Sequence, residues 1–201
     1  FATLTVGRRG DLARHATLHA AAQWSWGLLT PVDQRALACC SVFRGGFDLA
    51  AARAVLGGDA LDRLQTLVDH SLVQTTGRSF SLYGWIREFA HQQLRDPEVP
   101  AERHRAHYLA LAESCAGGRD PDVLFAALEN ILAVQDGSPE QVARVSLALA
   151  DPLRARGPHV AYVQMLQGAL HVVEHVDPEL RTRIHLAHAR QLRNTGSLKD
   201  A

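Results

Sequence analysis

The sequence predicts a mainly α-helical protein in which a single β-hairpin interrupts the helices. Alanine is abundant, aromatic residues make up 6% of the chain and hydrophobic residues 47%, which favours helices packed through small side chains. Apolar residues recur at helical spacing except at residues 71–83, where the period becomes that of strands. Helix starts are marked where a capping side chain precedes a proline, at Thr30-Pro31, Asp120-Pro121, Ser138-Pro139 and Asp177-Pro178.

The first half of the chain predicts four helices before the hairpin. The first covers about residues 11–29, and the second starts after Thr30 with Val32 among its inward residues. Asp48 caps a short helix that ends at Leu56 before two glycines. Asp59 caps the fourth, for which helical spacing predicts a buried face of Leu61, Leu64, Leu67 and Val68.

The change of period predicts two strands, at residues 71–75 and 79–83, joined by a turn at residues 76–78. Helix then resumes over residues 85–94. Helices, a two-stranded hairpin and another helix follow one another in the order of a winged helix, so we predict a winged-helix domain, with its preceding helix, at residues 1–95.

After a short linker at residues 96–100, only helices are predicted. The breaks between them are short, so neighbouring helices should be antiparallel. We interpret residues 101–201 as a truncated TPR-like array, because Leu192, Gly196 and Ala201 suit the large residue, glycine and alanine of a TPR, although His185, His188 and Ala189 match poorly. The predicted helices cover about residues 101–116, 121–135, 139–156, 158–175 and 178–195.

Five blocks in order carry a family resemblance: residues 14–29, the SVFRGGF turn at 41–47, LQTLVDHSLV at 64–73, FSLYGWIREFA at 80–90, and the helix segment at 107–113. Together they resemble the STAND class of NTPases, in particular bacterial regulators of the AfsR and LuxR-like type. The resemblance implies an ATP-binding module upstream in cis, a winged helix that relays its ATP or ADP state, and helical repeats that bind a protein or small-molecule effector.

The ATP-binding NTPase module itself is not expected in this chain. A P-loop needs a lysine between a glycine and a serine or threonine, and the only lysine, Lys199, lies between Leu198 and Asp200. We therefore expect a non-catalytic regulatory fragment of a longer protein, cut at both ends, with no catalytic residues and no cofactor of its own. ATP or ADP is implied only for the missing module.

One motif departs from the resembled family. In plant-type relatives a Met-His-Asp motif in the winged helix touches ADP, and the matching positions here are Leu82, Tyr83 and Gly84. Tyr83 and the nearby Arg87 are the candidates for facing the missing nucleotide module. We favour the simpler interpretation, in which Arg87 is a solvated helix residue or forms an ion pair with Glu88 or a neighbour.

Direct DNA binding is the main alternative function, because winged helices often bind DNA. The recognition helix would be residues 60–69. Its outward charged residues are one arginine, Arg63, and three carboxylates, Asp59, Asp62 and Asp69. The turn of the hairpin adds one further cation, Arg78. Phosphate contacts need clustered cations, and the formal net charge of the chain is +0. Direct DNA binding by this surface is therefore not expected.

A zinc hydrolase is the third alternative. Residues 171–175, HVVEH, match the pattern of inverted zinc peptidases, and His171 and His175 would share a helix face. A third ligand is still needed, and only Glu179 follows nearby. Further histidine pairs lack an intervening acid, so we expect helix-surface histidines and no metal site; these pairs are His15/His19, His104/His107 and His185/His188.

The number of cysteines and the hydropathy of the chain indicate the compartment in which the protein is expected. Cys39, Cys40 and Cys115 are too few, and odd in number, for a disulfide framework, which fits a reducing cytoplasm. No stretch is long and apolar enough to span a membrane, and no signal peptide is recognisable. We therefore expect a cytoplasmic protein that makes no membrane contact.

Overall fold

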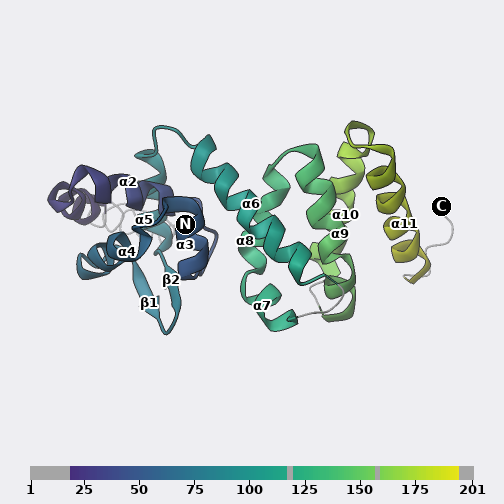
Figure 1. The fold of residues 1–201 in the computed structure, drawn as a ribbon, viewed down its shortest axis with the longest axis horizontal. Coiled ribbons are helices and arrows are strands. Elements are labelled where there is room, and N and C mark those ends of the chain that lie inside the picture. Colours follow the sequence, from purple (N-terminus) through teal and green to yellow (C-terminus); the bar gives the residue numbers. More distant parts are fainter. Residues whose placement is uncertain (1–18, 117–119, 157–158, 195–201) are drawn as a thin grey trace, which may run out of the picture. The chain divides into compact units, whose positions relative to one another are not determined.

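Capping side chains begin four of the helices in the computed structural model, which describes residues 19–116, 120–156 and 159–194. The chain divides into two units, Phe1–Ala101 and Glu102–Ala201 (Figure 1). The described part is mainly helical and holds one two-stranded sheet, as predicted. None of the helices in this part is long and apolar enough to cross a membrane.

The first unit follows the predicted order of elements. Residues 19–28 are helical and are followed by α2 (Pro31–Cys40), α3 (Leu49–Leu56) and α4 (Ala60–Asp69). The Thr30 hydroxyl accepts the backbone N–H of α2 at 3.3 Å, and the Asp48 carboxylate accepts that of α3 at 2.8 Å, so both predicted caps are confirmed. The prediction for Asp59 is wrong: it makes no side-chain capping bond and instead lies 3.2 Å from Arg63.

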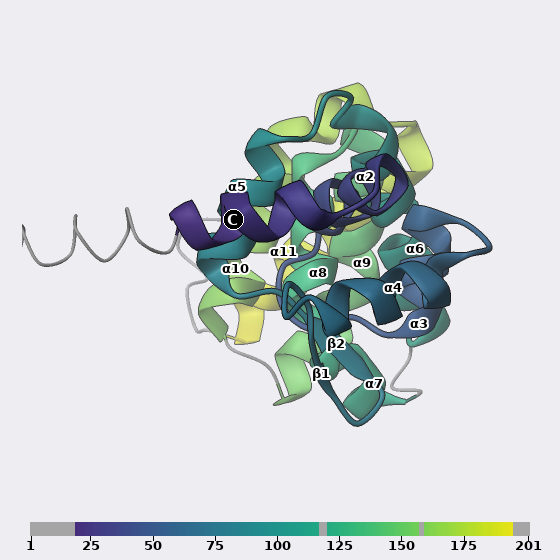
Figure 2. The ribbon, with the colours of Figure 1, turned by 90° about the vertical axis from the view of Figure 1, so that its left-hand side faces the viewer.

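The hairpin is shorter than predicted. It consists of β1 (Gln74–Thr76) and β2 (Ser79–Ser81), paired antiparallel, and Figure 2 shows it extending beyond α4. The predicted strand residues 71–73 instead close the end of α4, because Ser71 adopts a left-handed conformation (φ 58°). The backbone N–H groups of residues 72 and 73 both donate to the Leu67 carbonyl, at 2.9 and 3.2 Å.

A third short segment pairs with β2. Phe47 and Phe80 exchange two backbone hydrogen bonds, of 2.9 and 2.7 Å. The Phe47 ring stacks on Phe43, with 3.9 Å between centroids and 10° between planes. This bridge was not predicted from the sequence, because a single paired residue leaves no periodic pattern.

The core of the first unit is formed by apolar residues of α2, α3, α4 and α5 (Gly84–Gln92), together with residues of the segment between α2 and α3. Leu64 and Leu67 are fully buried, as predicted. Leu61 and Val32, predicted to face inward, are 48% and 56% exposed, because both lie on the solvent side of their helices. The largest buried side chains of this unit are Leu37, Phe43, Leu64, Leu67, Ile86 and Phe89.

The second unit continues with helices only. α6 (Glu98–Ser114) starts within the predicted linker. The predicted helix at 121–135 is divided into α7 (Pro121–Ala126), α8 (Leu128–Leu132) and the 3-10 helix η1 (Ala133–Asp136). Asp120 has a left-handed backbone (φ 45°) and makes no side-chain capping bond, so the predicted cap at this site is wrong.

The last helices lie side by side (Figure 1). They are α9 (Pro139–Arg156), α10 (His159–Val172) with the 3-10 helix η2 (Val173–His175), and α11 (Pro178–Asn194). Both α10 and α11 pack against α9. The predicted capping box is confirmed, since Ser138 and Gln141 exchange side-chain to backbone bonds of 3.0 and 3.3 Å. Asp177 caps α11 by accepting two backbone N–H groups, at 2.8 and 3.3 Å.

The TPR-like interpretation remains a prediction. Gly196 and Ala201 lie outside the described residues, as does the Leu192 side chain, and so do residues 11–18 of the predicted first helix.

Candidate interaction surfaces

The single arginine of α4 is held by carboxylates of its own unit. Its Nη1 donates to Asp33 Oδ1 at 2.8 Å, and its Nε lies 3.2 Å from Asp59 Oδ2. The Thr30 hydroxyl also donates to Asp33, whose side chain is 5% exposed. The Thr30 hydrogen bond, and then the Arg63 guanidinium, hold the pKa of Asp33 below its usual value. Arg63 therefore joins α2 to α4 and is not a free surface cation.

The outward face of α4 carries acidic and neutral side chains. Leu61, Asp62, Gln65 and Asp69 are exposed, and the Gln65 amide donates to the Asp69 carboxylate at 2.8 Å. At the tip of the hairpin, Arg78 is exposed. This surface therefore has the acidic character that the sequence predicted.

Tyr83 and Arg87 lie at the beginning of α5. Tyr83 is 49% exposed and stacks on Trp85, with 6.3 Å between ring centroids and 15° between planes. The Arg87 backbone N–H donates to the Tyr83 carbonyl at 2.9 Å. Among the described residues, Arg87 forms no ion pair with Glu88 or another acid. Whether Tyr83 and Arg87 face a nucleotide module stays a prediction.

The histidine motif does not lie on one continuous α-helix. α10 ends at Val172, and His175 belongs to the 3-10 helix η2 that follows it. The His171 ring Nδ1 lies 2.7 Å from the Gln167 carbonyl of its own helix. Within residues 19–116, 120–156 and 159–194, no group of three or more His, Cys, Asp or Glu side chains is placed to hold one metal ion.

The three thiols are free cysteines. Cys40 and Cys115 are buried, and Cys39 is half-buried. Burial raises the pKa of the Cys40 thiol far above its usual value. The two buried cysteines therefore serve as small core side chains.

One buried polar pair supports the second unit. His104 and Asn130 are 2% and 1% exposed, and His104 Nε2 lies 3.0 Å from Asn130 Oδ1. The His104 ring also lies against Tyr108, 4.7 Å between centroids. No sequence motif marks this pair, because its members are 26 residues apart and belong to α6 and α8.

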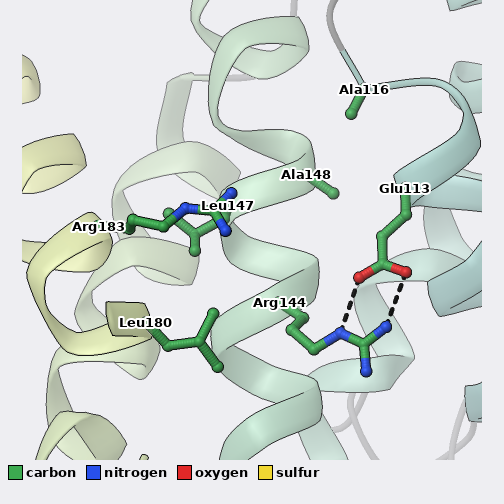
Figure 3. A pocket seen from close by; sticks show the side chains of 7 residues that line it. All are labelled: Glu113, Ala116, Arg144, Leu147, Ala148, Leu180 and Arg183. Carbon is green, nitrogen blue, oxygen red and sulfur yellow. Dashed lines mark hydrogen bonds and ion pairs between the residues drawn. The ribbon is translucent and has the colours of Figure 1, made fainter. Parts of the chain in front are cut away.

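Three hollows are lined by helices of the second unit. One, of about 340 Å³, is lined by α6, α9 and α11 (Figure 3). Glu113 holds Arg144 there through two bonds of 2.8 and 2.9 Å, and Figure 3 shows Arg183 extending from α11 toward α9. A second hollow, of about 210 Å³, is lined by α9, α10 and α11 and shares Leu147 and Arg183 with the first. A third, of about 380 Å³, lies beside Cys115 and Phe125.

Comparison with known proteins indicates a regulatory context. No protein-family model matches the chain, and no solved structure matches it. The chain is 41% identical over 135 residues to a protein of Mycobacterium tuberculosis, and equally to one of Mycobacterium bovis, both provisionally named HTH-type transcriptional regulators. The matches cover 61% of this chain and 15% of each relative.

An uncharacterised protein of Mycobacterium tuberculosis is 33% identical over 119 residues, which covers 52% of this chain and 30% of that protein. The chain thus spans less than a third of the length of these curated relatives. The name of the first relatives fits a regulatory role for this chain.

Proposed function

We propose that the chain is a non-catalytic regulatory part of a longer bacterial protein, a STAND-type signalling ATPase or transcriptional regulator that acts in the cytoplasm. In this proposal the first unit is a winged helix that relays the ATP or ADP state of an upstream NTPase module. The second unit is a TPR-like array that binds a protein or small-molecule effector. The helix order, the hairpin and the extra strand pairing at Phe47 support the winged helix, and the much greater length of the relatives supports the further modules.

The observation that carries the proposal is the charge on α4, the helix that would read DNA. A DNA-reading helix presents free arginine or lysine side chains to phosphates and bases. In α4 the arginine is held by Asp33 and Asp59, while Asp62 and Asp69 face outward. These exposed carboxylates would repel a duplex and are compatible with a protein partner.

A DNA-binding winged-helix transcription factor is the alternative, and the name of the relatives favours it. That name describes a whole protein, of which the matched stretch is 15%. It therefore does not say whether the helix-turn-helix lies in the part that this chain matches.

Fluorescence anisotropy of labelled duplex DNA with the 201-residue chain separates the two functions. Under the proposal, no sub-micromolar binding is expected at physiological salt, because α4 offers no free cation. Tight, salt-dependent binding that is lost in Arg78→Ala would overturn the proposal and support the alternative.

The nucleotide relay is tested in the longer protein that contains this chain. If the relay runs through this surface, Tyr83→Ala should weaken the binding of fluorescent ADP several-fold, because the exposed Tyr83 side chain stands at the start of α5, whereas Arg87→Ala, at a half-buried position, should have a smaller effect. Arg95→Ala, an exposed change beyond the end of the same helix, is the control and should leave ADP binding unchanged. Equal ADP binding by all variants would remove Tyr83 and Arg87 from the relay.

A further inference from the structure

Two hollows of the second unit are neighbours, and we treat them together as one groove. Both are lined by α9 and α11, and they share Leu147 and Arg183. The volumes of the two parts are about 340 and 210 Å³. We call this surface, from Glu113 at one end to Arg190 at the other, the α9–α11 groove.

Four arginines line the groove, but only two of them are available to a ligand. Arg144 is held by Glu113 through two bonds of 2.8 and 2.9 Å. Arg154 donates to the carboxylate of Asp151, on the same helix, at 3.1 Å. Among the described residues, Arg183 and Arg190 have no hydrogen-bond or ion-pair partner, and both are exposed. The α11 side of the groove therefore carries two free positive charges.

The spacing of these charges suits a helical segment. Arg183 and Arg190 are seven residues apart on α11, which is two helical turns, or about 10 Å along the axis. A guanidinium recognises a carboxylate through paired N–H donors. Two carboxylates at a similar separation would therefore match the two arginines.

Between and beside the arginines the lining is apolar. Leu186 is 51% exposed, although it is a large hydrophobic residue. Leu147 and Leu180 are half-buried beneath the groove, and Ala187 adds a small side chain. An apolar side chain placed here would bury the exposed surface of Leu186 at the interface.

We propose that the α9–α11 groove binds an acidic peptide segment of a partner protein. The carboxylates of the segment pair with Arg183 and Arg190, and an apolar side chain between them packs on Leu147 and Leu186. This inference rests on the proposed function, since it names the effector class for the helical unit. Nucleic acid fits less well, because phosphates need a continuous run of cations, whereas this groove is apolar between its two free arginines.

The test uses the 201-residue chain and labelled peptides of about 14 residues with two glutamates seven positions apart and leucines between them. One matched peptide replaces both glutamates by glutamine, and another replaces them by lysine. Anisotropy should show binding of the acidic peptide and about tenfold weaker binding of the glutamine peptide, because the charge-assisted bonds are lost. Preference for the lysine peptide, or no binding of the acidic peptide, would overturn the proposal.

Variants of the chain locate the binding. The double change Arg183→Gln and Arg190→Gln should weaken binding of the acidic peptide by about tenfold or more. Because both side chains are exposed, the circular dichroism melting curve should stay unchanged. Arg193→Gln is the matched control, since Arg193 is exposed on the same helix outside the groove. Equal binding by the double variant would refute the groove assignment.

A labelled duplex, measured in parallel, separates this inference from the proposed function. Duplex binding lost in the double variant would overturn the peptide assignment. Duplex binding that survives in the double variant but is lost in Arg78→Ala would instead overturn the proposed function of the first unit.

Discussion

Leu64→Ala tests whether α4 supplies the core of the first unit. Leu64 is a fully buried residue of α4, and α4 packs against both α2 and α3. The change removes three carbon atoms, worth about 0.8 kcal/mol each in transfer free energy, and the cavity left behind adds to this loss. We expect the free energy of unfolding to fall by about 3 kcal/mol. Leu61→Ala, on the same helix but 48% exposed, should cost less than about 0.5 kcal/mol.

Tryptophan fluorescence in a urea titration measures this loss selectively. All three tryptophans, at positions 24, 26 and 85, belong to the first unit, so their emission follows its unfolding. With a urea dependence of about 1.5 kcal/mol per molar, the midpoint for Leu64→Ala should fall by about 2 M. An unchanged midpoint, or an equal shift for Leu61→Ala, would refute the assignment of the buried face.

Three further predictions concern charge, capping and space. The pKa of Asp33 is lowered in the folded protein, so the ionised carboxylate stabilises the fold above pH 4, and this stabilisation is lost as pH falls through the lowered pKa. The urea midpoint followed by tryptophan fluorescence should therefore fall less steeply with acidification in Asp33→Asn than in the unchanged protein. An identical pH profile for the two proteins would contradict this. Ser138→Ala, which removes the bond to the Gln141 N–H, should cost about 1 kcal/mol in circular dichroism melting without moving the fluorescence midpoint. Gly137→Ala should destabilise the second unit by about 1–3 kcal/mol, because a methyl group there would meet a backbone carbonyl oxygen at 2.9 Å; a melting temperature equal to that of the unchanged protein would contradict this.

The sequence predicted elements best where local chemistry decides them. Thr30, Asp48, Ser138 and Asp177 act as caps because each side chain bonds to backbone N–H groups within three residues. Asp120 failed as a cap, since its own backbone adopts a left-handed conformation.

Long-range contacts could not be predicted from one sequence. Arg63 was recognised as the cation of α4, but its pairing with Asp33, 30 residues earlier, depends on how α2 and α4 pack. The exposure of Leu61 depends on the same packing, because the apolar stripe of α4 is wider than the surface that its neighbours cover. The α9–α11 groove was not predicted either, because its arginines belong to no motif and its lining depends on how the helices pack.

The pairing of β2 on both sides leaves β1 as the outer strand of the sheet. β1 contributes three residues, Gln74–Thr76, all polar and all exposed. An open strand edge invites pairing with another chain, and a short, polar edge gives such pairing little to bury. The β1 edge of the hairpin is therefore a poor template for self-association through the sheet.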